Sequence, residues 1–368
     1  MRFSRALALV LLAVLFQTAW ADQVVPSDRV ESRLRVRLDA NSTSTVVGYL
    51  YPGQAARLDQ SVSYWYQVTL SDGTSGYVSK SWVQVVPDPV SGAQYLRLGG
   101  WNVKKLGHGS STNFALVAQV IESHFDIVAI VEVMQKGGAH PGYDSLLAQL
   151  GARWRGMVTT SPRPNTSAGD AEFYAIVYRD QSVQPCTGWT GLRYLDDNDG
   201  SSTGTGPDVF SREPAFGCFA ARLASGSTGF DFMLAAYHAR WAGGNTQEIG
   251  EEFRHVTRAF QAMAQARPGE NDRIIVGDFN LVTSRLEQVL GLQIPVLGTA
   301  STLNSSGNLS SNLYDHILIH DTTATRELVD IPEILDVRDV AADPRTFYRT
   351  VSDHLPIRAR FRSDVDDD

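Results

Sequence analysis

The stretch FDIVAIVE at residues 125–132 is an apolar run of the kind that forms a buried strand, and it ends in one carboxylate, Glu132. Three further segments also place polar side chains at the end of a strand-like run: Trp101-Asn102, Gly277-Asp278-Phe279-Asn280 and Ser352-Asp353-His354. The end of a strand is where an open sheet presents side chains to a cleft rather than to its core. Because these segments span about 250 residues, only a folded domain can bring them together. We therefore expect one composite site built from all four.

Around these segments, strand-like runs alternate with helical patterns from Tyr95 onward. The expected strands cover residues 96–103, 125–133, 172–178, 216–223, 230–238, 273–277, 314–320 and 355–361, and the expected helices cover 114–124, 143–150 and 246–266. This order of elements is typical of two sheets packed face to face with helices outside. The predicted fold class is therefore α/β, a four-layer α/β/β/α sandwich over residues 95–362.

Residues 24–86 have a different pattern, with short strand-like runs separated by turn signals such as Tyr51-Pro52-Gly53 and Ser71-Asp72-Gly73. The pattern resembles a small all-β bacterial SH3-like barrel, which implies a module that binds cell-wall peptide or acts as a spacer. The residues that carry the resemblance are Leu34–Arg37, Pro52-Gly53, Trp65–Val68, Gly76–Val78 and Trp82-Val83. Five aromatic residues of this segment either line a ligand groove or fill its core: Tyr64, Trp65, Tyr66, Tyr77 and Trp82.

The first residues have the form of a secretory signal. Arg2 and Arg5 precede an apolar run at residues 6–16 that is short for a membrane span, and Ala19-Trp20-Ala21 is a cleavage site of the small-x-small type. We expect a signal peptide at residues 1–21 and a periplasmic or secreted protein that begins at Asp22 and has no later transmembrane segment. An uncleaved membrane anchor is the alternative. Residues 87–94 are expected to be a linker and 363–368 an acidic tail, and nothing in the sequence requires more than a monomer.

The net charge of −8 over 368 residues gives no overall basic field of the kind that nucleic-acid binders use. A nucleic-acid substrate stays open, because bound divalent cations can supply positive charge locally. Cys186 and Cys218 are an even number of cysteines in a chain expected to be exported, which predicts a disulfide. Two buried free thiols are the alternative.

The polar residues at the strand ends are those that phosphodiester hydrolysis requires: groups that neutralise the phosphate, activate a water and protonate the leaving oxygen. Glu132 and Asn102 offer the oxygen ligands that Mg²⁺ takes in proteins. Asp278 and Asn280 alternate along one strand end, so both side chains face the same side. His238 and the histidine at 354 follow separate strands and can move protons near neutral pH.

Longer stretches resemble the endonuclease/exonuclease/phosphatase superfamily, and within it most of all deoxyribonuclease I. They are WNVKKLG at 101–107, FDIVAIVEV at 125–133, EFY at 172–174, VYR at 177–179, FSREPA at 210–215, Tyr237-His238, GDFN at 277–280, LYD at 313–315 and SDH at 352–354. The FSREPA segment points to the deoxyribonuclease branch in particular. The resemblance covers roughly residues 95–362 and implies a metal-dependent phosphodiesterase with DNA as its substrate.

The resemblance also implies a role for each residue of the composite site. The metal would be Mg²⁺, with Mn²⁺ or Ca²⁺ as alternatives. The implied metal ligands are Glu132, Asn102 and Asp353, and the implied acid/base pair is His238 and His354, held by Glu172 and Asp315. Asp278 and Asn280 would position the phosphate and the water, and Arg212 and Asn102 would also contact the substrate.

Two departures from the deoxyribonuclease pattern put duplex binding in doubt. Met134 stands where that pattern has a basic residue that reaches the minor groove, and Asp170 stands where it has an aromatic residue that packs on the sugar. A second hypothesis therefore keeps the chemistry and changes the substrate to a lipid head group, as in sphingomyelin or a phosphoinositide, or to a small phosphate ester. A third makes the protein a non-catalytic cell-wall binder. The third is disfavoured because no metal or acid/base residue is missing.

Overall fold

The computed structural model describes residues 23–27, 29–30, 32–86, 95–107, 111–160, 172–195, 209–291, 298–320, 327–329 and 331–366. The expected signal peptide, linker and Asp170 lie outside these ranges, as do the last two residues of the expected tail. Within the described part of the chain, no helix combines the length and the apolar character that a membrane crossing requires.

The first sheet of the larger domain is built around the run that opens at Phe125. β9 (Ile127–Met134) is buried along almost its whole length, because its β-branched residues are covered on both faces. It pairs in parallel with β8 and antiparallel with β11, and β8 pairs antiparallel with the C-terminal strand β19. The spatial order of the strands is β10 (Trp154–Val158), β11 (Glu172–Arg179), β9, β8 (Tyr95–Leu106), β19 (Ile357–Arg362) and β18 (Glu333–Ile334).

The second sheet comes from one continuous part of the chain. β15 and β16 pair in parallel, and the other neighbouring strands of this sheet pair antiparallel. The spatial order is β12 (Val183–Pro185), β14 (Ala215–Arg222), β15 (Thr228–His238), β16 (Arg273–Asp278) and β17 (Asp315–His320), with β13 (Arg193–Tyr194) paired to β14.

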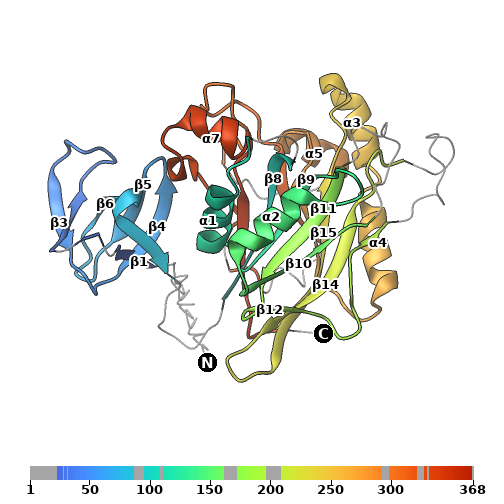
Figure 1. Ribbon diagram of the computed structural model, residues 1–368, viewed down its shortest axis with the longest axis horizontal. Coiled ribbons are helices and arrows are strands. Elements are labelled where there is room, and N and C mark those ends of the chain that lie inside the picture. The colour runs from blue at the N-terminus through green and yellow to red at the C-terminus, as the bar shows by residue number, and fades with distance from the viewer. Residues whose placement is uncertain are drawn as a thin grey trace, which may run out of the picture.

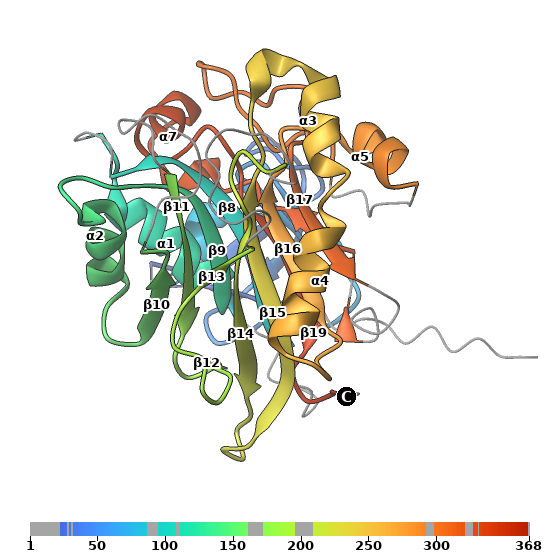
Figure 2. The same cartoon turned by 90° about the vertical axis from the view of Figure 1, so that its right-hand side faces the viewer.

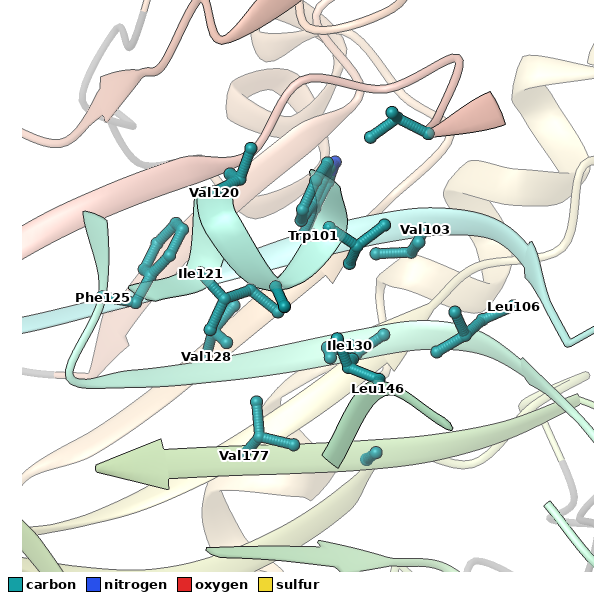
Figure 3. Packing of buried hydrophobic residues seen from close by; sticks show 14 of the residues in the cluster. Trp101, Val103, Leu106, Val120, Ile121, Phe125, Val128, Ile130, Leu146 and Val177 are labelled. Carbon is teal, nitrogen blue, oxygen red and sulfur yellow. The ribbon is translucent and has the colours of Figure 1, made fainter. Parts of the chain in front are cut away.

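Three buried apolar clusters separate four layers. The first cluster packs helices α1 (Phe114–His124) and α2 (Pro141–Leu150) on the first sheet, through residues that include Ile121, Leu146 and Trp101 (Figure 3). The second lies between the two sheets, and the third packs α3 (Thr246–Phe253) and α4 (Thr257–Ala266) on the second sheet. Figure 1 shows α1 on one side of the paired sheets and α3 and α4 on the other, and Figure 2 shows the second sheet face-on. The four-layer α/β/β/α prediction is therefore confirmed.

The helices follow from local signals. Asn113 caps α1 by accepting a hydrogen bond from the Leu116 N–H at 3.2 Å, and Asp343 caps α7 in the same way through Thr346 at 2.9 Å. The helices are α1 (Phe114–His124), α2 (Pro141–Leu150), α3 (Thr246–Phe253), α4 (Thr257–Ala266), α5 (Thr283–Leu290) and α7 (Pro344–Thr350), with 3₁₀ turns η1 (Lys80–Trp82), η2 (Ala242–Gly244) and η3 (Arg338–Val340).

The prediction of a single long helix at residues 246–266 is wrong, since the structure divides this segment into α3 and α4. At the break, the N–H groups of His255 and Val256 donate to carbonyls three residues earlier rather than four. This tighter turn keeps Phe253 and Val256 in the same buried cluster as Met263. The spacing of apolar residues along the sequence does not reveal such a local change in the winding of a helix.

The N-terminal module is an all-β unit with its own small core, which contains Val36, Val68 and Val78. Its strands, in spatial order, are β3 (Val46–Leu50), β2 (Leu34–Arg37), β6 (Ser75–Ser79), β5 (Trp65–Thr69), β4 (Ala56–Val62), β1 (Gln23–Pro26) and β7 (Val83–Val86). Figure 1 shows this module in blue beside the larger domain, on the side of α1.

The structure contains the predicted disulfide between Cys186 and Cys218, which joins the chain next to β12 to the centre of β14. We expect that replacing both cysteines by Ser lowers the free energy of unfolding by about 3–4 kcal/mol, because the crosslink restricts the unfolded chain. Urea denaturation of the two proteins measures the difference. Equal urea midpoints, with an unchanged slope of the unfolding free energy against urea concentration, would contradict the expectation.

Candidate active site

A row of three directly paired residues forms one half of the site. His238 at the end of β15 lies opposite Asp278 at the end of β16, and Asp278 lies opposite Asp315 at the start of β17. Directly paired residues point to the same face of a sheet, so these side chains converge. Gly277 has a φ of 152°, and a Cβ there would lie 1.9 Å from the Tyr237 carbonyl oxygen. Only glycine therefore fits beside this row.

Asp278 lies at the centre of the site. Its Oδ2 atom is 3.6 Å from Nε2 of His238 and 3.6 Å from Nε2 of His354, and it accepts a hydrogen bond from the Asn102 amide at 3.0 Å. Its Oδ1 atom accepts from the backbone N–H of Asn280 at 2.9 Å. Since Asn102 belongs to β8, this carboxylate joins the two sheets.

His238 has a carboxylate partner on its other nitrogen. Nδ1 lies 2.7 Å from Oε2 of Glu172, whose second oxygen accepts from Arg212 at 2.9 Å. Burial and the Arg212 charge lower the pKa of His238, whereas the carboxylates of Glu172 and Asp278 raise it, and the net pKa lies above its ordinary 6.5. The structure thus places Glu172 where it can hold the ring and stabilise the positive charge that the ring gains when it accepts a proton.

His354 has an equivalent partner from the second sheet. Its Nδ1 atom lies 2.8 Å from Oδ2 of Asp315, and that oxygen accepts from the Ser301 hydroxyl at 2.6 Å. Burial lowers the pKa of His354, whereas the carboxylates of Asp315 and Asp278 raise it, with a net result of about 10. This imidazole is therefore cationic at neutral pH.

Glu132 and Asn102 form the part of the site that fits a hard cation. One oxygen of Glu132 accepts from the Asn102 amide at 2.9 Å and the other from the Lys105 N–H at 2.8 Å. Oδ1 of Asn102 is buried and has no hydrogen-bond partner among the described residues. A carboxylate beside an unpaired amide oxygen is the donor set that Mg²⁺ prefers. Glu132 and Lys105 also have φ values of 59° and 45°, a costly backbone conformation that clusters at functional sites.

Asp353 is placed differently from the other two expected metal ligands. Its Oδ2 atom is 3.1 Å from the Lys104 ammonium group, which also lies 3.9 Å from the centre of the Tyr348 ring. Among the residues that the structure describes, no three His, Cys, Asp or Glu side chains form a group that could hold a metal ion. Glu132 and Asn102 thus lie in direct contact, whereas Asp353 is paired with Lys104.

The two expected phosphate-binding side chains meet at the loop that follows β15. The Asn280 amide donates to the Ala239 carbonyl at 2.8 Å, and Arg212 donates to the same carbonyl at 3.0 Å. Nε of Arg212 is buried without a hydrogen-bond partner in the described structure. Asn280 has a φ of 51°, which turns the chain sharply after Asp278. Both residues thus border the site and fix the position of His238.

Three hydroxyl groups to which we assigned no role from the sequence support the site. The Ser352 hydroxyl donates to the Asn102 carbonyl at 2.6 Å and accepts from the His354 N–H at 3.0 Å. Ser301 donates to Asp315, and the Tyr174 hydroxyl accepts from the His238 N–H at 3.3 Å. Tyr174 could have been found, because it lies two residues after Glu172 and so on the same face of β11. Ser301 has no such signal, since it lies in a loop.

Comparison with known proteins agrees with this architecture. A deoxyribonuclease of Thioalkalivibrio sp. (strain K90mix) is 29% identical over 279 residues, which cover 73% of this chain and 72% of that protein. An endonuclease/exonuclease/phosphatase family protein from Bacteroides thetaiotaomicron has a TM-score of 0.52 at 18% identity and covers 74% of this chain and 100% of its own. A protein from Bacteroides vulgatus described in the same terms has a TM-score of 0.51 at 18% identity, with coverage of 74% and 100%.

The larger domain therefore has the fold of the endonuclease/exonuclease/phosphatase proteins, as the resemblance predicted. The bacterial SH3 domain family matches residues 32–84, which confirms the assignment of the N-terminal module. Fold, site and sequence relative together support a phosphodiester hydrolase.

Proposed function

We propose that this protein is an exported, divalent-metal-dependent phosphodiesterase that hydrolyses DNA without sequence preference. The observation that carries the proposal is the convergence of two carboxylate-held imidazoles on one oxygen of Asp278, each at 3.6 Å. Acid/base hydrolysis of a phosphodiester requires one group that accepts a proton from water and one that donates to the leaving oxygen. The similarity to the Thioalkalivibrio deoxyribonuclease favours DNA as the substrate.

The pKa values and partners of the two imidazoles suggest which one is the general acid and which one the general base. His354, with a pKa near 10, is protonated at neutral pH and is the general acid for the leaving oxygen. His238 takes the complementary role of general base, with Asp278 between the rings to orient the attacking water. Arg212 and Asn280 border the same space and would donate to the phosphate oxygens.

Glu132 and Asn102 would hold Mg²⁺, with Mn²⁺ or Ca²⁺ as alternatives, and Asp353 would join them if it exchanged its Lys104 partner for the ion. The bound cation would neutralise charge on the phosphate. Holding that cation would also use the Asn102 oxygen, which has no hydrogen-bond partner in the described structure.

Replacing Glu132 by Gln is expected to lower the rate of Mg²⁺-dependent plasmid nicking by about 100-fold or more, because the amide removes the negative charge that holds the cation. The Mg²⁺ concentration at half-maximal rate should rise in parallel. Glu122→Gln is the matched control, since Glu122 pairs with Arg153 on the surface. Equal Mg²⁺ dependence in Glu132→Gln and the natural protein would exclude this metal site.

A second candidate substrate is a lipid head group, as in sphingomyelin or a phosphoinositide, or a small phosphate ester. Met134 favours it, because this side chain is buried opposite Glu172 and offers no charge to a duplex. The deciding experiment is an assay of the chain from Asp22 with Mg²⁺ or chelator, on plasmid DNA and on sphingomyelin and phosphoinositide vesicles. Metal-dependent nicking supports the DNA proposal, whereas hydrolysis of the lipids without nicking refutes it.

A further inference from the structure

The SH3 module carries a basic groove that the catalytic proposal does not use. The groove has a volume of about 490 Å³ and is lined by Arg29, Arg33, Arg35, Arg37, Trp65 and Trp82, among others. No described residue that lines it is acidic. In a protein with a net charge of −8, such a collection of arginines is a local exception.

The strand geometry explains how the arginines share one face. Arg35 and Arg37 alternate along β2 with Val36, whose side chain is fully buried in the core of the module. Alternation on a strand directs residues two apart to the same side, so Arg35 and Arg37 both point away from that core. The exposed Arg33 lies one step earlier in the same alternation.

Aromatic rings support two of the guanidinium groups. The Arg33 guanidinium lies 4.3 Å from the centre of the Tyr49 ring, and that of Arg29 lies 5.4 Å from the centre of the Trp82 ring. Stacking on a ring leaves the N–H groups at the guanidinium edge available to other partners. One NH₂ group of Arg29 donates to the Ser81 carbonyl, and the remaining N–H groups can donate to a phosphate. Trp82 itself is 45% exposed, although it is one of the largest apolar side chains of the module.

We propose that this groove is a second binding site, which holds a strand of nucleic acid through its phosphates and bases. The arginines would pair with successive phosphates, and Trp82 and Trp65 would stack on bases, the combination that binds single strands without sequence preference. The proposal rests on the proposed function, since it gives the nuclease a separate means of retaining its substrate. It also explains how an acidic protein could hold a polyanion.

Contacts between the module and the larger domain would keep the groove at a fixed place. The Lys80 ammonium group donates to the Asp336 carbonyl, and the Asp336 carboxylate accepts from both Ser63 and Arg338. Arg338 in turn donates to the Ser63 hydroxyl at 3.0 Å. A strand bound in the groove would therefore remain near the catalytic domain, which raises its effective concentration there.

The test is direct binding of a fluorescein-labelled 20-nucleotide single strand to the chain from Asp22, measured by anisotropy in chelator so that no cleavage occurs. The double variant Arg33→Glu/Arg35→Glu should bind at least about tenfold more weakly. The slope of the logarithm of its binding constant against the logarithm of the salt concentration should be smaller in magnitude by roughly 1.4. Trp82→Ala should weaken binding by about fivefold or more with an unchanged salt slope. Arg57→Glu is the control, because Arg57 is exposed on β4 and does not line the groove.

Two further readouts separate this proposal from the catalytic one. Hydrolysis of bis(p-nitrophenyl) phosphate should be unchanged in all of these variants, because the active site is intact. Binding equal to that of the natural protein in both groove variants, or an equal loss in Arg57→Glu, would overturn the proposal. So would loss of sedimentation with purified cell-wall sacculi in groove variants that still bind the oligonucleotide. If the protein binds the oligonucleotide through the groove but cleaves no DNA, the proposed function is refuted. The assignment of the groove as a nucleic-acid site is then still supported.

Discussion

The variant His238→Ala is expected to nick plasmid DNA about a thousandfold more slowly than the natural protein. The ring it removes is the proposed general base, and loss of such a group typically costs a factor of 10² to 10⁴. Glu172 keeps its ion pair with Arg212 at 2.9 Å, so the variant does not leave this buried carboxylate without a partner. The thermal melt should therefore stay close to that of the natural protein.

Plasmid nicking with Mg²⁺, together with a thermal melt monitored by circular dichroism, measures both effects. His255→Ala serves as the control, because His255 lies in the turn between α3 and α4 and outside the site. Added imidazole should restore part of the lost rate in His238→Ala. Retention of full nicking activity by this variant would remove His238 from the mechanism.

Asp278→Asn is expected to have an effect of the same order, about a thousandfold on nicking. It should also lower stability by about 1–3 kcal/mol, because the new NH₂ group cannot accept from the Asn102 amide as Oδ2 does. The amide has nearly the shape of the carboxylate and keeps an oxygen that can accept from the Asn280 N–H. It has no charge, however, so the two imidazoles lose the anion that both face at 3.6 Å. The substitution therefore tests the charge of Asp278 separately from its shape.

This variant also has a readout apart from activity. Asp278 is one of the carboxylates that raise the pKa of His354 to about 10, so the pKa should fall in Asp278→Asn while Asp315 still keeps it raised. Titration of the His354 ring followed by NMR measures it. A pKa that does not move would show that Asp278 and His354 are not coupled, against the geometry described above.

The predictable parts of the fold are those that follow from the local pattern of apolar and polar residues. The apolar run at residues 125–132 predicts β9, and the strands that end at His238 and Asp278 were placed to within a few residues. Asp278 ends β16 as expected, but Asn280 lies beyond that strand at a bend with a φ of 51°, so the expected alternation of these two residues along one strand was wrong. The break between α3 and α4 was not predictable, because the hydrophobic periodicity continues through it.

Other features depend on contacts between distant segments. The resemblance suggested that Glu172 and Asp315 hold the two histidines, whereas nothing in the residues themselves pairs positions 66 or 39 apart. The ion pair between Lys104 and Asp353 likewise joins β8 to the segment before β19. The arginines of the groove were visible in the sequence, but only the packing of β2 shows that they share a face.

The position of β19 has a consequence for how this protein folds. β19 pairs with β8, and Trp101 of β8 donates to the His354 carbonyl across a sequence separation of 253 residues. Contacts between such distant segments form slowly, because the entropy of closing the loop is lost before the contact stabilises the fold. We therefore expect nicking activity to return with the slowest phase of refolding, after most of the secondary structure has formed.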